Sequence, residues 1–112
     1  ASRDSDGCIG VRATYAGCLE GGGTATAAVL ACAHDEFVFQ DKRLNDVYKR
    51  LLETLGASDK QKLHEEERKW LACKESRCSL NQDEGTIDQI SASDCEVTET
   101  ARRARDLQRR TE

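Results

Sequence analysis

The six cysteines of this 112-residue chain constrain its fold more than any other feature. An even number of cysteines in a short chain predicts a disulfide framework, and therefore an oxidising compartment. The alternative, six reduced thiols in the cytosol, does not fit so high a density of cysteine. Many pairings are open to Cys8, Cys18, Cys32, Cys73, Cys78 and Cys95.

The composition predicts an all-α chain. Proline is absent, aromatic residues make up 4% of the sequence, and charged residues make up 34%. Strong helix formers dominate after residue 24. The length fits one domain, and no apolar run is long enough to span a membrane. The polar start, Ala1 to Ser5, suits the terminus left after removal of a signal peptide, although a shortened recombinant chain would begin alike.

We expect an irregular, glycine-containing arm over residues 1–23 and a helical domain over residues 24–112. The first helix begins at Thr24 or Thr26 and ends near residue 55, before Gly56. A capping box at Ser58 starts the second helix, which runs to about residue 79. Residues 79–93 form a loop with at most a short helix. The third helix, from about 93 to 109, has small apolar residues and is expected to lie across the other two.

The short connection at residues 56–57 predicts an antiparallel hairpin. This pairing brings Leu44 opposite Trp70, which we expect to be the largest buried side chain. It also brings Asp41 opposite Lys74, inside the two apolar stripes. We expect these two residues to form a partly buried ion pair; the alternative is that both extend to solvent.

The same residues carry a resemblance. Asp41-x-x-Leu44-Asn45-x-x-Tyr48 and Trp70-x-x-x-Lys74-Glu75-x-x-Cys78 are followed by Cys95-x-x-x-x-Thr100-x-x-Arg103-x-x-x-Leu107. Over residues 30–108 the chain resembles the family named for the N-terminal domain of the lysozyme inhibitor LprI. The resemblance implies a small exported helical domain and, for some members, inhibition of lysozyme. Lys74-Glu75 replaces the usual Arg-Asp, Glu67 replaces a Gln, and Cys73 and the N-terminal arm are particular to this chain.

The disulfide framework can then be ranked. Cys78 and Cys95 flank the predicted loop, and the family pattern retains both, so their bridge is the strongest prediction. Cys18–Cys32 is the local choice across the glycines, which leaves Cys8–Cys73 as an added staple. The rival map pairs Cys8 with Cys18 and Cys32 with Cys73. In this rival map the Cys32–Cys73 bridge would join positions about 13 Å apart along the hairpin, beyond the reach of a disulfide.

Several chemical functions lack their sequence signature. The histidines and cysteines do not have the paired short spacing of a metal site, so no metal and no cofactor are expected. No nucleophile motif, phosphate-binding loop or isolated carboxylate pair is present, so we expect no enzymatic activity. The arginines of residues 102–110 are read as a helix C-terminus rather than as a nucleic-acid site, because the rest of the chain is acidic.

The remaining interpretation is that the protein binds another protein. Residues 1–100 carry a net charge of −7, which favours a basic partner. The loop with Asp83, Glu84 and Asp88 is the candidate contact, although it is equally well explained as an ordinary polar connection. We expect a periplasmic or secreted inhibitor that blocks a lysozyme or related hydrolase sterically. The alternatives are an immunity protein that neutralises a delivered toxin, and an envelope accessory domain with no enzyme target.

Overall fold

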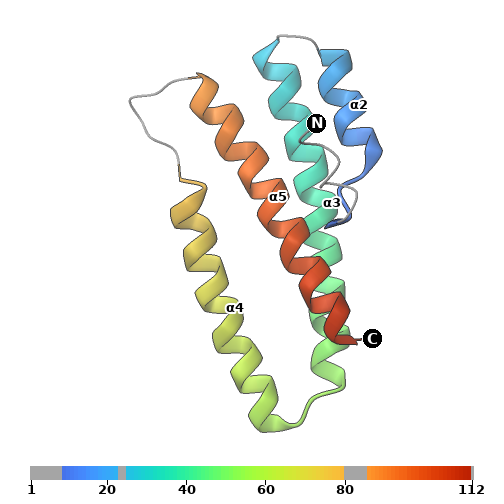
Figure 1. Cartoon of the computed structure of the whole chain (residues 1–112), viewed down its shortest axis with the longest axis vertical. Coiled ribbons are helices and arrows are strands. Elements are labelled where there is room, and N and C mark those ends of the chain that lie inside the picture. The colour runs from blue at the N-terminus through green and yellow to red at the C-terminus, as the bar shows by residue number, and fades with distance from the viewer. Residues whose placement is uncertain (1–8, 23–24, 80–85, 112) are drawn as a thin grey trace.

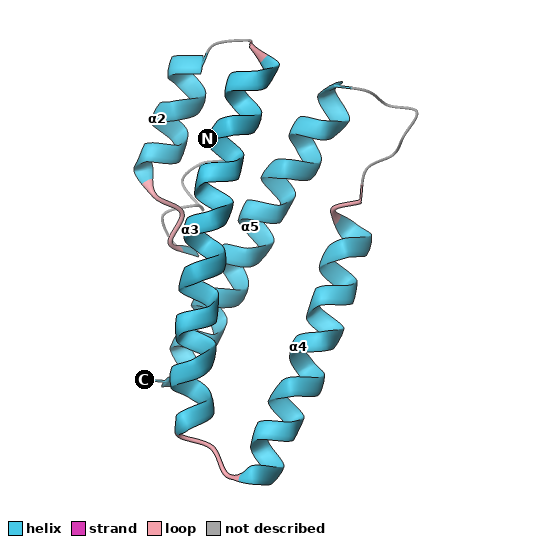
Figure 2. Ribbon diagram, turned by 180° about the vertical axis from the view of Figure 1, so that it is seen from behind, coloured by secondary structure: helices cyan, strands magenta, loops and turns pink. Residues whose placement is uncertain are grey.

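The computed structural model describes residues 9–22, 25–79 and 86–111, and the regular elements within these ranges are helices (Figure 1). They are α2 (Ala13–Gly22), α3 (Thr26–Glu53), α4 (Ala57–Arg77) and α5 (Thr86–Thr111). The helices α3 and α5 run in the same direction, and α4 returns in the opposite one (Figures 1 and 2). The predicted all-α class, with a helical hairpin and a third long helix, is confirmed.

Two element boundaries differ from the prediction. Ala13–Gly22 is helical although the arm was expected to be irregular, and α5 begins at Thr86, inside the expected loop. Neither predicted N-terminal cap forms, because Ala25 and Gly56 precede α3 and α4 without a side-chain hydrogen bond. Helix propensity and capping are weak signals, and tertiary packing of the short segment overrides them.

The core has two parts, and we call the part at the end that carries α2 the upper core and the part at the opposite end the lower core. The upper core joins the N-terminal segment to α3 and α5. Tyr15 of α2 is 3% exposed, and its hydroxyl donates a hydrogen bond to Asp94 at 2.7 Å. Apolar side chains from all three elements fill this cluster: Ile9, Val11, Tyr15, Cys32, Ala33, Val97 and Ala101. Residues 9–22 are therefore part of the folded body and not an irregular arm.

Buried polar groups fasten the same segment to α3. Glu36, 1% exposed, accepts hydrogen bonds from the Nε and the backbone N–H of Arg12 at 2.8 and 3.0 Å. Gln40 donates to Glu36 and to the carbonyl of Gly10. Gly10 has a φ of +92°, and a Cβ there would lie 2.5 Å from Nη1 of Arg43. Glycine is thus required where the chain turns onto α3.

The lower core is formed mainly by α3 and α5, with Leu63 as the buried apolar contribution of α4. The stripe of α5 was correctly identified, but the expectation that α5 only lies over the hairpin was wrong. Its small side chains let the α3 and α5 backbones approach closely, so the stripe becomes the centre of the molecule. Each of its members is 0% exposed: Val97, Ala101, Ala104 and Leu107.

Trp70 is only partly buried and packs against the lower core from the side of α4. The prediction that it is the largest buried side chain is therefore wrong. The largest fully buried side chains include Leu107, Gln40 and Glu36. The reason is that α4 leans away from α3 towards its C-terminal end, so its apolar stripe is not covered (Figure 2).

Ion pairs between long side chains hold α4 to α5. In the upper half, Lys74 pairs with Glu96 at 2.7 Å and Arg77 with Glu99 at 2.9 Å. In the lower half the signs are reversed: Glu67 pairs with Arg103 at 2.8 Å, and Glu66 pairs with Arg103 and Arg110. Sliding either helix along the other would bring like charges together. We call these four acidic and four basic residues the charge ladder.

Two disulfides are confirmed. Cys18–Cys32 ties α2 to α3 with a Cα–Cα distance of 5.8 Å, and Cys78–Cys95 ties the end of α4 to α5 at 5.4 Å. Cys73 is a free, exposed thiol, so the predicted Cys8–Cys73 staple is wrong, and Cys8 lies outside the described residues. Cys73 is exposed because the outer surface of α4, where it lies, packs against no other described element.

The fold predicts a contrast between two leucines. Leu107→Ala should lower the free energy of unfolding by about 2–5 kcal/mol, because it opens a cavity between α3 and α5. Leu71→Ala, at a side chain that is 41% exposed, should change it by about 0.5 kcal/mol or less. Urea denaturation followed by circular dichroism measures both. Equal effects would contradict the assignment of α5 to the centre.

Candidate functional site

A groove runs between α3 and α4, and α5 forms part of its floor. It exists because the charge ladder and the two ends of α4 hold this helix beside the α3–α5 pair without bringing it into close contact. The groove has a volume of about 360 Å³. Residues of three helices line it: Asp41, Leu44, Asn45, Tyr48, His64, Glu67, Arg68, Trp70, Leu71, Lys74 and Thr100.

Two further hollows continue this groove. One, of about 480 Å³, shares His64 and Arg68 with it and extends towards the turn between α3 and α4. The other, of about 410 Å³, shares Lys74 and extends past Phe37 towards the N-terminal half of α5. The three hollows follow one another along α4, and neighbouring hollows share the side chains of His64 and Arg68 or of Lys74.

Asp41 and Lys74 both line the groove, as their predicted levels on the hairpin require, but they do not form the predicted ion pair. Lys74 is buried and pairs with Glu96, whereas Asp41 is exposed on the opposite rim. The cause is α5, which places a carboxylate closer to Lys74 than α3 does. The ammonium of Lys74 also lies 5.6 Å from the ring centroids of both Phe37 and Trp70.

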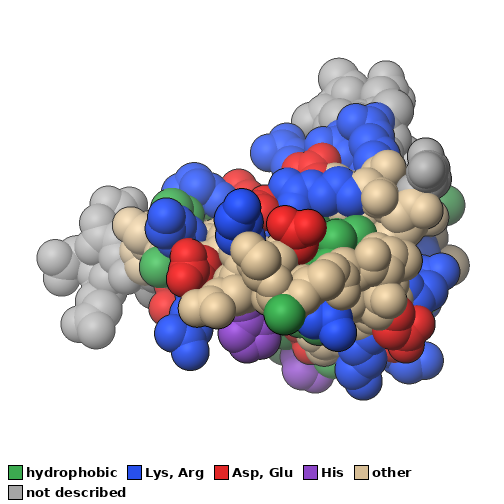
Figure 3. Space-filling view, turned by 90° about the horizontal axis from the view of Figure 1, so that it is seen from below, with side chains coloured by type: hydrophobic (Ala, Val, Ile, Leu, Met, Phe, Trp, Pro, Cys, Tyr) green, Lys and Arg blue, Asp and Glu red, His purple; other side chains and the backbone are tan. Residues whose placement is uncertain are grey.

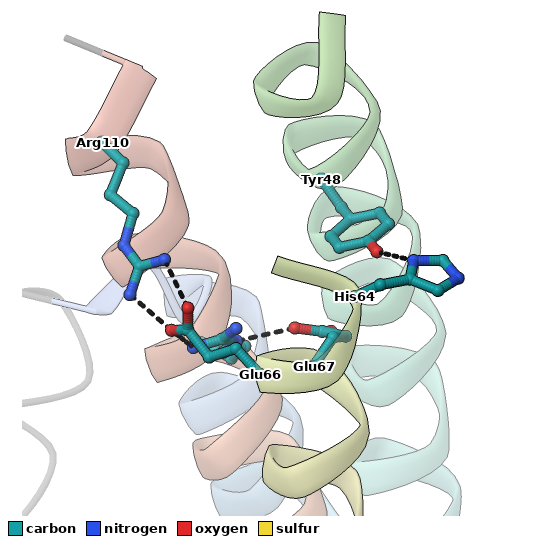
Figure 4. A network of polar contacts seen from close by, with 6 residues as sticks. Tyr48, His64, Glu66, Glu67 and Arg110 are labelled. Atoms are coloured by element: carbon teal, nitrogen blue, oxygen red, sulfur yellow. Dashed lines mark hydrogen bonds and ion pairs between the residues drawn. The ribbon is translucent and has the colours of Figure 1, made fainter. Parts of the chain in front are cut away.

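The middle of the groove has a polar wall. The Tyr48 hydroxyl is hydrogen-bonded to Nδ1 of His64, across the groove from α3 to α4 (Figure 4). Burial raises the pKa of Tyr48, and the nearby Glu67 carboxylate raises it further. Tyr48 is therefore a neutral phenol at physiological pH, and it and His64 together can donate and accept hydrogen bonds.

The floor of the groove contains a buried hydroxyl without a partner. Oγ1 of Thr100 makes no hydrogen bond, although the residue is 1% exposed. One turn later, Nη2 of Arg103 is likewise buried and unpaired, while its Nε and Nη1 bond Glu67 and Glu66. The guanidinium of Arg103 lies 5.9 Å from the ring centroid of Trp70. Buried polar atoms are normally satisfied, so this pair of atoms requires an explanation.

Glu66 lies at the lower end of the charge ladder, between two arginines (Figure 4). Hydrogen bonds from Arg110 and then from Arg103 lower the pKa of Glu66 to about 2, against the opposing effect of burial. The pairing with Glu66 raises the pKa of Arg110 in turn. This contact fixes the C-terminal turn of α5 to α4.

The described charges separate towards the two ends of the molecule. At the end that carries α2, residues 9–37, 74–79 and 86–99 contain eight acidic and three basic side chains, a net of −5. At the opposite end, residues 42–69 and 100–111 contain thirteen basic and seven acidic side chains, a net of +6. We call these the acidic end and the basic end. Figure 3 views the molecule towards the basic end, where Lys and Arg side chains are prominent.

The predicted contact residues are described only in part. Asp83 and Glu84 lie outside the described residues, and Asp88 falls in the first turn of α5. The C-terminal end of α4 and the N-terminal end of α5 both lie at the acidic end (Figure 1). Their role in binding stays a prediction.

Other kinds of site have no basis in the described part of the chain. Within residues 9–22, 25–79 and 86–111, no three His, Cys, Asp or Glu side chains are grouped as metal ligands. Nor does any helix in these ranges have the length and apolar character needed to cross a membrane.

The sequence model of the family described as lysozyme inhibitor LprI matches residues 18–107. This chain belongs to the LprI family. Members of this family are exported proteins. No curated protein and no solved structure matches the chain.

The residues that carry the resemblance to LprI gather in the groove. Seven of them line it: Asp41, Leu44, Asn45, Tyr48, Trp70, Lys74 and Thr100. From the sequence, Leu44 and Trp70 were expected to pack together and Asp41 and Lys74 to form an ion pair. The groove was not predicted, because the hairpin was expected to close. Glu96 was not predicted as the partner of Lys74 either. The signal available was the run of Glu96, Glu99 and Arg103 on one face of α5, which complements the charges of α4.

The pKa of Glu66 predicts a pH dependence of stability. Because the folded-state pKa, about 2, lies below the unfolded value near 4.5, the contact stabilises the fold above pH 4.5. The contribution should be lost as the pH falls from 4.5 to 2. Urea denaturation of the wild type and of Glu66→Gln checks this: the wild type should be more stable at pH 7, and the difference should shrink at acidic pH. A constant difference from pH 7 to pH 2 would show that the charge of Glu66 is not the cause.

Proposed function

We propose that this protein binds and inhibits a lysozyme or a related peptidoglycan hydrolase, in the periplasm or outside the cell. It does so by covering the enzyme and performs no chemical step of its own. The observation that carries the proposal is the match to the lysozyme inhibitor LprI family over residues 18–107. Two disulfides and the buried network around Glu36 support it, because a rigid scaffold loses little entropy on binding.

The acidic end is the proposed contact surface. Its net charge of −5 over the described residues suits a basic enzyme. Charge of one sign on a surface increases the association rate of an oppositely charged partner. The basic end would repel the same partner, so the charge separation also orients the approach.

Part of this charge separation has a structural cause. The helices α3 and α5 are parallel, so the positive ends of two helix dipoles lie at the acidic end and the negative ends at the basic end. Side chains of the opposite sign stabilise both ends. This accounts for Arg50, Arg109 and Arg110 in the last turns of α3 and α5. It does not account for the other charges, because the first turn of α3 holds no acid and Glu75 lies in the last turn of α4, where a helix dipole disfavours an acid.

A panel of lysozymes tests the proposal. The protein should inhibit the lysis of a peptidoglycan suspension by basic lysozymes with a saturable dose dependence. Binding should weaken as salt is raised, because exposed charges are screened over about 8–10 Å at physiological ionic strength. No inhibition of any lysozyme or related hydrolase would contradict the proposal.

Neutralisation of the loop locates the contact. The triple variant Asp83→Asn, Glu84→Gln, Asp88→Asn should associate with the inhibited enzyme about tenfold more slowly at low salt. A matched variant at the basic end, Lys60→Gln, Lys62→Gln, Arg109→Gln, changes as many charges and should not slow association. Surface plasmon resonance measures both rates. If the loop variant associates as fast as the wild type, the contact lies elsewhere.

A further inference from the structure

The unpaired hydroxyl at the floor of the groove is the starting point. A buried Thr hydroxyl without a hydrogen bond destabilises the fold, and a valine of nearly the same shape would avoid this loss. Thr100 is nevertheless the residue through which α5 lines the groove. Oγ1 itself has almost no accessible surface, so a molecule in the groove can donate to it or accept from it where the lining side chains move aside.

The walls limit what that molecule can be. Leu44 and the Trp70 ring give the groove an apolar side, while Asp41 and Asn45 on one rim and Arg68 on the other offer acceptors and donors. The formal charges of the lining residues balance, because Asp41 and Glu67 offset Arg68 and Lys74. Glu67 and Lys74 are in addition paired with α5. An anion or a cation would therefore gain little electrostatic attraction from the lining, and a wholly apolar ligand would leave the Thr100 hydroxyl without a hydrogen bond.

We propose that the groove binds an uncharged sugar chain that carries hydroxyl and amide groups. One sugar ring lies with its apolar face on Trp70, and one of its polar groups is hydrogen-bonded to Oγ1 of Thr100. The ring hydroxyls reach the rims at Asp41, Asn45 and Arg68. The volume of about 360 Å³ falls within the usual range of small-molecule sites, about 300–1,000 Å³.

The length of the groove favours a chain over a single ring. The hollow beyond His64 and Arg68 and the hollow beyond Lys74 extend the groove in both directions. Further sugar units of a chain can lie over these hollows, past the side chains of His64 and Lys74 that separate them from the middle of the groove. The middle of the groove, at Trp70 and Thr100, lies outside the acidic end, whereas the hollow beyond Lys74 belongs to it. The inference about Thr100 therefore does not depend on the proposed contact with a lysozyme.

Trp70 reports on the groove directly because it is the only tryptophan of the chain. The probe is a tetramer of β-1,4-linked N-acetylglucosamine. Its addition to the full chain should change the tryptophan fluorescence with saturation, and calorimetry should give the same dissociation constant. The monomer should bind more weakly than the tetramer. Absence of saturable binding by the tetramer would overturn the proposal.

Three variants in α5 test whether the Thr100 hydroxyl is hydrogen-bonded to the sugar. Thr100→Val should weaken tetramer binding about three- to tenfold, the value expected for one hydrogen bond, without lowering the thermal unfolding temperature. Thr100→Ser keeps the hydroxyl and should keep most of the affinity. Thr98→Val is the matched control on the same helix, outside the groove lining, and should bind like the wild type. Equal binding by the Thr100→Val and Thr98→Val variants would overturn the assignment.

Two comparisons separate this inference from other occupants and from the proposed function. If a lysozyme peptide or an anion such as succinate binds with the same dependence on Thr100 and the tetramer does not, the class of ligand is wrong. The Thr100→Val variant should still inhibit lysozyme. If the wild type inhibits lysozyme but does not bind the tetramer, the proposed function stands and the sugar site is refuted. If the wild type binds the tetramer but inhibits no lysozyme, the sugar site stands and the proposed function is refuted.

Discussion

The charge ladder between α4 and α5 determines the shape of the molecule. The helix α4 has one buried leucine, Leu63, and cannot be held by an apolar face as α3 and α5 hold each other. The more exposed pairs, Arg77–Glu99 and Arg110–Glu66, contribute only about 0–1 kcal/mol each. The pairs of the buried Lys74 and Arg103 lose hydration that offsets their attraction, so the ladder selects the register more than it supplies stability. The turn after α3 and the Cys78–Cys95 bridge confine both ends of α4. The long side chains in between keep it at a distance, and the groove is the result.

The two surfaces with a proposed role follow from different features of the same three helices. The groove depends on α4 standing away from α3, and its lining is balanced in charge. The acidic end depends on α3 and α5 running parallel, which places acidic side chains at their common N-terminal end. A protein partner steered by charge would thus approach the end of the molecule and leave the groove on its side accessible. Separate surfaces allow separate mutations, so the two roles can be tested independently.

Local signals in the sequence were sufficient for much of this fold. The stripes gave the long helices and the levels at which Leu44 meets Trp70, and chain proximity gave Cys18–Cys32 and Cys78–Cys95. The predictions that were wrong concern contacts with a third element, α5. Lys74 was assigned to Asp41 because Glu96 comes from α5, and the small residues Ala101 and Ala104 were read as peripheral because their closeness to α3 has no sequence signal. The helix α2 was missed because its order comes from the Cys18–Cys32 bridge and the burial of Tyr15.

Arg103 joins the ladder, the groove and the core in one side chain. It is 7% exposed, bonds Glu66 and Glu67 on α4, and lies against the ring of Trp70 one turn from Thr100. A lysine would keep the charge, but its single ammonium cannot bond both carboxylates with the fixed geometry of a guanidinium fork. Lys74, by contrast, pairs with one carboxylate, that of Glu96, for which a single ammonium is sufficient. The guanidinium stands where two carboxylates and an aromatic ring are held together, and that contact sets both the position of α4 along α5 and the position of the Trp70 ring in the groove.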